Sequence, residues 1–335
     1  MEFLSAFHKH GIMKVPKPKS TNTATQSTLV QVAHLYFDEN LSQQEIATRL
    51  GVSRSLIAQY LQHARDSGIV RIQIVDPTDT CSELESWLRK ATGVKHVTVI
   101  PNPRGSELLM MRAVATAASE YIAGLLKDGY TLGLAWGRTT SEVVNHLQLT
   151  RVQQIDVLPL MGETSHSGLH SQMSQMVMKA AQSLRAKAHF LSLPMVVSSI
   201  NLHNALIKED GCRDVIEAWN DVDIACFGIG TVPPVPGMVA YIGEKHLPHL
   251  LNEGAVGDVC GIYYNREGKI IKTGVEDRTI SISLLQLKAI DCVVGVACGE
   301  GKAVSVVGAL RTGLISALFI DQEMAEQIRV ILRAR

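Results

Sequence analysis

Residues 41–68 read LSQQEIATRLGVSRSLIAQYLQHARDSG, a stretch that predicts two short helices joined by a tight turn. Ser42 followed by Glu45 has the spacing of a capping box, which starts a helix. Gly51 allows the chain to bend with positive φ, and Ser53 is a suitable N-cap for the second helix. Apolar residues at helical spacing give the two helices a shared buried face: Ile46, Ala47, Leu50, Ile57, Tyr60 and Leu61. This combination is typical of a helix-turn-helix, whose second helix enters the major groove of DNA.

The polar residues around this turn are the candidates for contact with DNA. Arg54, Ser55 and Gln59 are expected on the exposed face of the second helix, where they can meet bases or nearby phosphates. Gln43 and Gln44, at the start of the preceding helix, are expected to contact phosphate. The full candidate set is Gln43, Gln44, Ser53, Arg54, Ser55 and Gln59. Residues 1–75 contain eight Lys or Arg and five Asp or Glu, a net charge of +3 that weakly favours DNA contact.

The flanking sequence suggests the boundaries of the parts. Lysines, prolines and hydroxyl residues dominate the start of the chain, which has little to bury and is expected to be disordered. A supporting helix at 28–40 and a wing-like strand at 69–75 complete the DNA-binding unit. The predicted parts are a leader at 1–25, the helix-turn-helix domain at 26–77, a linker helix at 78–92 and a second domain at 93–335.

Length and composition limit the class of protein. The chain has 335 residues, 46% of them hydrophobic, which predicts two domains with a large core. Its six cysteines include no CxxC pair and its 12 histidines show no metal-binding spacing, so we expect no metal, disulfide or cofactor. No signal peptide or apolar run of transmembrane length is evident. We therefore expect a soluble, cytoplasmic protein with no membrane partner.

The second domain alternates apolar strands with amphipathic helices. Runs such as TLGLAW (131–136), DIACFGIG (223–230) and CVVGVAC (292–298) are each followed by a helical pattern. This alternation predicts a Rossmann-like α/β domain, with a parallel or mixed sheet and helices on both faces.

Ligands in such sheets bind at the carboxyl ends of the strands. Residues 137–140 combine a glycine with hydroxyls before a helix, which can cradle a phosphate. The alternative is an ordinary turn with Thr140 as N-cap. Residues 299–302 add two glycines, which permit close approach of the backbone, and Lys302, which adds a positive charge near the same sheet edge. The alternative is that Lys302 is an ordinary solvated lysine in a turn. Asp258 can accept sugar hydroxyls, or it can bond only to its own backbone. The candidate effector-binding residues are Gly137, Arg138, Thr139, Thr140, Gly230, Asp258, Gly299, Gly301 and Lys302.

Together these loops suit a phosphorylated sugar or polyol. An enzyme acting on such a compound needs a placed acid or base, and Asp258 or Glu300 can serve, although nothing in the sequence requires it. One hypothesis is thus a DNA-binding regulator that responds to such a ligand. The main alternative is a sugar-phosphate isomerase or deaminase with an accessory helical domain. A non-specific architectural DNA protein fits poorly, because the net charge is zero and the α/β part is large.

From about Leu29 to its end the chain resembles the SorC family of sugar-responsive transcription regulators. The resemblance rests on residues 41–74, LAWGRTT (134–140), DIACFGIG, GAVGDVCGIYYNREGKI (254–270) and GVACGEGKAVSVVGAL (295–310). It implies a winged helix-turn-helix and an effector domain similar to sugar-phosphate isomerases and deaminases. It also implies a phosphorylated effector and a homotetramer on double-stranded operator DNA of a carbohydrate or polyol catabolic operon.

The resemblance also assigns roles to single residues. It implies that Thr139 and Thr140 lie in the phosphate-binding turn, that Asp258 faces the sugar and that Lys302 supplies a cation. The chain departs from the family pattern at two places. Ala58-Gln59 stands where the family often has Ser-Arg, and Met161-Gly162-Glu163 stands where it often has a glycine pair.

Overall fold

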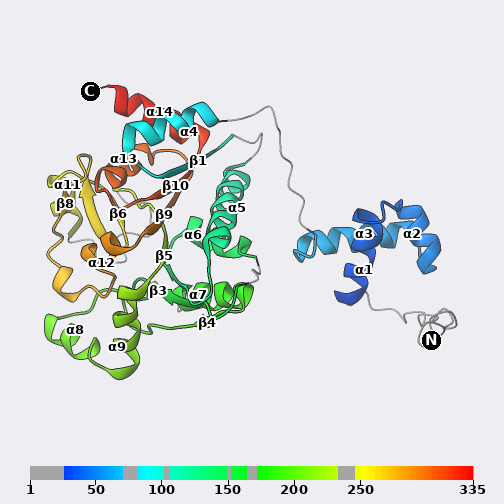
Figure 1. Ribbon diagram of the computed structural model, residues 1–335, viewed down its shortest axis with the longest axis horizontal. Coiled ribbons are helices and arrows are strands. Elements are labelled where there is room, and N and C mark those ends of the chain that lie inside the picture. The colour runs from blue at the N-terminus through cyan, green and yellow to red at the C-terminus, as the bar shows by residue number, and fades with distance from the viewer. Residues whose placement is uncertain are drawn as a thin grey trace, which may run out of the picture. The chain divides into compact units, whose positions relative to one another are not determined.

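The computed structural model describes residues 26–70, 81–101, 106–148, 152–163, 172–232 and 246–334, in two compact units (Figure 1). The first unit belongs to residues 1–77 and the second to residues 78–335. The predicted leader and the wing strand beyond residue 70 lie outside the described residues.

The smaller unit contains α1 (Gln26–Phe37), α2 (Gln43–Leu50) and α3 (Arg54–Asp66). The predicted capping box is present, because the Ser42 side chain accepts from the Glu45 N–H and the Glu45 carboxylate accepts from the Ser42 N–H. Gly51 ends α2 with φ of 67°, and Ser53 caps α3. The core of this unit joins all three helices through Val32, Leu35, Ile46, Ala47, Ile57 and Leu61. The predicted helix-turn-helix is therefore confirmed.

In the larger unit, the described helices alternate with strands as the sequence predicts. The α-helices are α4 (Ser82–Thr92), α5 (Glu107–Leu125), α6 (Arg138–His146), α7 (Gln172–Leu184), α8 (Ile200–Leu206), α9 (Asp210–Glu217), α11 (Leu247–Asn252), α12 (Leu284–Ala289), α13 (Ala303–Arg311) and α14 (Gln322–Arg333). Two 3₁₀ turns, η1 (Ala218–Asp221) and η3 (Glu276–Arg278), lie between them.

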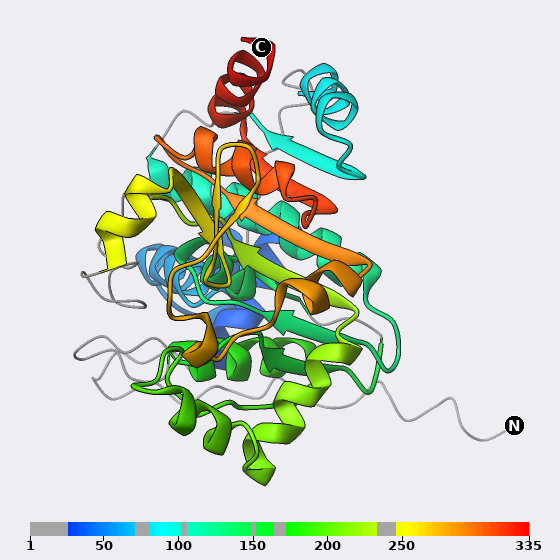
Figure 2. The ribbon, with the colours of Figure 1, turned by 90° about the vertical axis from the view of Figure 1, so that its left-hand side faces the viewer.

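The strands of the described chain form a large parallel sheet and a small antiparallel one (Figure 2). The large sheet has the order β1-β10-β9-β5-β2-β3-β4, and every pairing in it is parallel. The small sheet has the order β6-β7-β8. The bounds are β1 (His96–Ile100), β2 (Thr131–Leu134), β3 (Asp156–Pro159), β4 (Lys187–Ala188), β5 (Ile224–Gly228), β6 (Ala255–Val259), β7 (Ile262–Asn265), β8 (Ile270–Ile271), β9 (Cys292–Ala297) and β10 (Ala317–Asp321).

The path through the large sheet reverses between β2 and β5. The chain runs outward from β2 through β3 to β4, returns to β5 on the other side of β2, and continues through β9 to β10. Because parallel crossovers are right-handed, the helices that follow one direction of travel lie on one face and those that follow the other direction lie on the opposite face. Accordingly α5, α6 and α7 pack against one another on one face, while α4, α13 and α14 pack together on the other. In sheets of this kind, ligands bind in the crevice outside the carboxyl ends of the strands at such a reversal, which here means at the ends of β2 and β5.

Two helices of this unit show how the tertiary packing uses them. The predicted linker helix, α4, packs onto β1 and α14, and its Glu85 carboxylate accepts from the Val99 N–H at 2.9 Å. Among the described helices, α5 alone is long and apolar enough to cross a membrane, judged by length and composition only. Here Val114, Ala118 and Ile122 of α5 lie buried in the main core, and α5 contacts β1, β9 and β10.

Candidate functional site

The first candidate surface is the exposed face of α3. Ser53, Arg54, Ser55 and Gln59 are exposed, while Ile57 of the same helix is buried in the core. The Ser53 hydroxyl accepts from the Leu56 N–H at 3.2 Å and lies 3.0 Å from the Ser55 hydroxyl. Ser53 therefore serves first as a helix cap, whereas Arg54 and Gln59 carry longer side chains on the exposed part of α3.

Gln43 and Gln44 open α2, immediately after its cap. Gln44 is exposed and Gln43 is half-buried. At the N-terminus of this helix the first N–H groups lack helical partners and the helix dipole is positive. That position suits contact with a phosphate better than contact with a base.

The second candidate surface is the carboxyl edge of the large sheet, where α6 begins after β2. The helix starts at Arg138 and Gly137 is its N-cap residue, so Thr139 and Thr140 lie in the first turn. The alternative interpretation of Thr140 as the N-cap is therefore wrong. Residues 138–140, which were expected to form a separate turn, are part of the helix.

The Thr140 side chain is fully buried, and its Oγ1 has no hydrogen-bond partner among the residues that the structure describes. The atom lies beside Gly137 and Gly228, at the end of β5. A Cβ on Gly137 would lie 3.3 Å from Oγ1, and one on Gly228 would lie 3.5 Å from it. A hydroxyl donor without a partner thus lies at the crevice between β2 and β5. Orphaned buried hydroxyls are rare and costly in native proteins.

The loop after β9 lies beside the start of α6. The Thr139 Oγ1 is 4.0 Å from the Cys298 Sγ, which links the two segments. Gly299 and Gly301 have positive φ, and the Gly299 N–H donates to the Asp321 carboxylate at 3.0 Å. Lys302 follows as the N-cap residue of α13. Two loops that are far apart in the sequence therefore converge, as predicted from their strand ends.

Lys302 is half-buried, and its charge interacts with several neighbours. Burial lowers the pKa of its ammonium group, and the nearby positive charge of Arg138 lowers it further. Cys298, Glu107 and Asp321 act in the opposite direction. Lys302 is therefore a partly desolvated cation beside a second cation, not a fully solvated turn lysine.

Asp258 lies elsewhere than expected: it is on β6 of the small sheet, not in a loop of the large one. Its carboxylate accepts from the Gly261 N–H at 3.2 Å, which matches the local backbone bond considered as an alternative. It also lies against Gly230, where a Cβ would collide with Oδ1, and the Gly230 N–H donates to the Asp258 carbonyl at 2.9 Å. Burial raises the pKa of Asp258 to about 6, against a smaller lowering by the Gly261 N–H.

Ser305 connects the Asp258 region to the rest of the edge. It lies in the first turn of α13, after Lys302, and its hydroxyl donates to the Gly230 carbonyl. It also lies 3.3 Å from the hydroxyl of the buried Tyr264. The small sheet thus reaches the same edge through the loop after β5, so the predicted residues on β6 and on three loops of the large sheet form one neighbourhood.

Sequence reasoning missed two acidic residues of this edge. Glu107, the first residue of α5, lies 3.9 Å from Arg138 and faces Gly299. Glu163, just after β3, accepts from the N–H groups of Met173 at 3.2 Å and Ser174 at 3.1 Å, so it caps α7. The only local signal for Glu107 is an acidic residue in the first turn of a predicted helix, which the helix dipole explains by itself.

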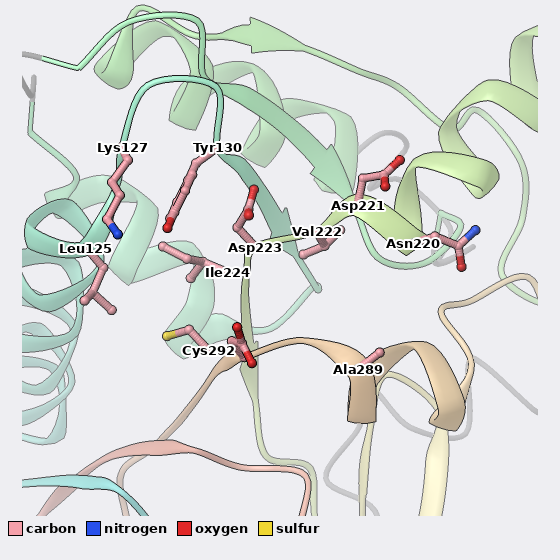
Figure 3. Close-up of a pocket in the computed structure, with 11 residues that line it drawn as sticks. Leu125, Lys127, Tyr130, Asn220, Asp221, Val222, Asp223, Ile224, Ala289 and Cys292 are labelled. Atoms are coloured by element: carbon pink, nitrogen blue, oxygen red, sulfur yellow. The ribbon is translucent and has the colours of Figure 1, made fainter.

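A separate cavity of about 470 Å³ opens at the opposite edge of the sheet (Figure 3). Tyr130, Asp223 and Cys292 line it, close to where β2, β5 and β9 begin. None of the sequence-predicted residues lies in it. The candidate site is therefore the carboxyl edge of the large sheet, because ligands of parallel sheets bind at the carboxyl ends of the strands.

Comparison with known proteins supports both halves of this description. Residues 76–329 match the family described as "Putative sugar-binding domain", and residues 34–71 match a winged helix-turn-helix DNA-binding family. The chain is 28% identical over 305 residues to the deoxyribonucleoside regulator of Bacillus subtilis (strain 168), covering 90% of this chain and 97% of that one. It is 27% identical over 304 residues to the sorbitol operon regulator of Klebsiella pneumoniae, covering 89% and 96%.

A solved structure agrees with these sequence matches. The full-length sorbitol operon regulator SorC from Klebsiella pneumoniae is similar with a TM-score of 0.74 at 26% identity. The similarity covers 92% of this chain and 99% of that protein, so it includes the helix-turn-helix as well as the α/β unit.

Proposed function

We propose, from the premise that this chain belongs to the SorC family of sugar-binding transcriptional regulators, that a phosphorylated sugar or polyol tunes its affinity for operator DNA. The chain is a DNA-binding transcriptional regulator and not an enzyme, since its relatives over nearly the whole length are named regulators. By analogy with relatives named for sorbitol and deoxyribonucleoside control, its operon handles a carbohydrate or polyol.

The buried Thr140 hydroxyl is the observation that carries the proposal of a phosphorylated effector. Its Oγ1 has no partner, although leaving a buried donor unsatisfied costs about 1–3 kcal/mol. It lies between two glycines at the crevice where the sheet order reverses. A phosphate oxygen entering this crevice would supply the missing acceptor.

The charges around the crevice support an anion. Both α6 and α13 begin without a side-chain cap and without an acidic residue in the first turn. Arg138 and Lys302 instead place cations at these positive helix ends, an arrangement that is unfavourable without a negative ligand. A phosphate would accept from both helix ends and neutralise both side chains.

Asp258 is proposed to accept a hydroxyl of the same ligand. Its Oδ1 lies over Gly230, which keeps the backbone close and leaves no side chain between the carboxylate and the end of β5. A ligand with phosphate at Thr140 and hydroxyls toward Asp258 would span the neighbourhood described above.

We propose that Arg54, Ser55 and Gln59 contact base edges or nearby phosphates of the operator. Gln43, Gln44 and Ser53 are proposed to lie near DNA phosphates. Good base contacts contribute about 1–3 kcal/mol each to discrimination. The protein is proposed to act in the cytoplasm, where operator DNA is found.

We further propose that the chain acts as a homotetramer, as the family resemblance implies. Several large apolar side chains of the larger unit are exposed, including Leu285 at 80% and Val330 at 67%. Such side chains can be covered by a second copy of the chain. Sedimentation that finds only a 36.5 kDa monomer, with and without DNA, would contradict this part.

The decisive experiment is footprinting on the DNA upstream of neighbouring genes, with pairs of phosphorylated and unphosphorylated sugars. We expect the footprint to change only with phosphorylated members. Lys302→Met keeps most of the length of the side chain but removes its charge, so it should preserve the footprint and lose the response. An equal response to a neutral parent sugar, or a normal response in Lys302→Met, would place the effector elsewhere.

A further inference from the structure

We propose that Glu107 is a built-in competitor of the effector phosphate, a carboxylate that holds the cations of the site until an anion displaces it. This inference rests on the proposed phosphate site, and it adds a residue that sets the affinity and charge selectivity of that site. Glu107 belongs to α5, whereas the cations belong to α6 and α13.

The geometry places Glu107 at the rim of the site. Its Oε1 lies 3.9 Å from the Arg138 guanidinium, and a Cβ on Gly299 would lie 3.3 Å from the same oxygen. Its charge also acts on Lys302 and on the Cys298 thiol. One carboxylate thus faces the start of α6 and the loop after β9, the two segments that would hold the phosphate.

Asp321, the other carboxylate whose charge acts on Lys302, cannot play this part. The Asp321 carboxylate is buried and both its oxygens are engaged, with the N–H groups of Gly299 at 3.0 Å and Met324 at 2.8 Å. Its role is to fix the loop and start α14. Glu107, in contrast, makes no comparable bond to a helix start within the described part of the chain, and its side chain is 69% exposed.

The Glu107–Arg138 pair is weak enough to be displaced. The two side chains are 69% and 68% exposed, and the distance between them is at the outer limit of an ion pair. Exposed pairs of this kind contribute little stability. A phosphate, which carries about two negative charges and several acceptor oxygens, would replace the carboxylate at Arg138 and Lys302 and would be repelled by it until it moves.

The buried Thr140 hydroxyl is an independent reason to place a ligand here. Glu107 is at the rim beside Arg138 and Gly299, and no hydrogen bond connects it to Thr140 in the described structure. The carboxylate therefore balances charge without satisfying the donor. A ligand that does both has an advantage that a neutral sugar lacks.

The test is calorimetric titration of the full chain with inorganic phosphate at low and high salt, comparing wild type with Glu107→Gln. We expect the variant to bind phosphate roughly three- to tenfold more tightly at low salt, and the difference to shrink as salt is added. Glu120→Gln is the matched control: Glu120 is an exposed residue of the same helix, and the charge change is identical. It should leave the affinity unchanged.

Each outcome decides the inference. Weaker phosphate binding in Glu107→Gln would mean that Glu107 positions Arg138 for the ligand and does not compete with it. Equal gains in both variants would mean that only net charge matters, and no phosphate binding in any of the three proteins would remove the site itself. Binding that is abolished by Lys302→Met but unaffected by Glu107→Gln would leave the proposed effector site standing and refute the competitor.

Discussion

Replacing Thr140 with valine should stabilise the unliganded protein and weaken its hold on phosphate. Valine has nearly the shape of threonine but carries a methyl group in place of Oγ1. That oxygen is buried without a partner, so its removal relieves a penalty of about 1–3 kcal/mol. The absent side chains of Gly137 and Gly228 leave space for the slightly larger methyl group.

The magnitude follows from the size of the unit. A gain of about 1 kcal/mol should raise the melting temperature of the larger unit by about 2–4 °C. In the proposed complex, the variant would lose a hydroxyl bond to a charged acceptor, which typically contributes about 1.5–3 kcal/mol. Phosphate affinity should therefore fall by roughly 10- to 100-fold.

Scanning calorimetry without ligand and titration with inorganic phosphate measure the two effects. Thr116→Val is the matched control, because the Thr116 hydroxyl on α5 donates to the Arg112 carbonyl at 2.8 Å. It should give no gain in stability and no loss of phosphate binding. If Thr140→Val melts at or below the wild-type temperature and binds phosphate normally, the reasoning from the unsatisfied hydroxyl is refuted.

Three further predictions concern other parts of the chain. Arg54→Ala should weaken operator binding by about 1–3 kcal/mol at unchanged melting temperature, whereas Arg65→Ala, on the last turn of the same helix, should weaken it less. Equal footprints for wild type and Arg54→Ala would exclude α3 as the helix that reads the bases. Ser42→Ala should destabilise α2 by about 0.5–2 kcal/mol, measurable by hydrogen exchange in the smaller unit, because the bond to the Glu45 N–H is lost. Burial raises the pKa of Asp258 from 3.8 to about 6, so the native state binds this proton more tightly than the unfolded chain does. The free energy of unfolding should therefore fall as the pH rises from about 4 to about 6, and denaturant titrations of Asp258→Asn should lack that part of the fall.

The helix-turn-helix was predictable because its signals are local. Ser42 and Glu45, Gly51 and Ser53 act within one turn of their own positions, through caps and a left-handed φ. The alternation of strands and helices in the larger unit was predictable for a similar reason, since the period of the apolar pattern belongs to each segment alone. The expectation that candidate ligand loops follow the strands rests on the general behaviour of parallel sheets, and it stays a prediction.

Errors arose where position depends on pairing. Asp258 was expected in a turn of the main sheet, but residues 255–259 pair with β7 and form a separate antiparallel sheet. Thr140 was considered as an N-cap, but α6 starts at Arg138 because the extended Gly137 directly precedes it. The linker helix was expected at 78–92; the structure describes α4 at 82–92, with Leu84 and Leu88 buried in the core of the larger unit.

The sequence by itself therefore determined the two kinds of domain, the recognition helix and the loops that carry glycine, hydroxyl and lysine. The tertiary structure decided that β5 lies between β2 and β9, so that those loops meet at one edge. It also decided that the Thr140 hydroxyl has no partner and that Glu107 faces Arg138. The physical reason is that capping and periodicity depend on neighbours within a few residues, whereas the environment of a buried hydroxyl or a charge depends on segments brought together by strand order.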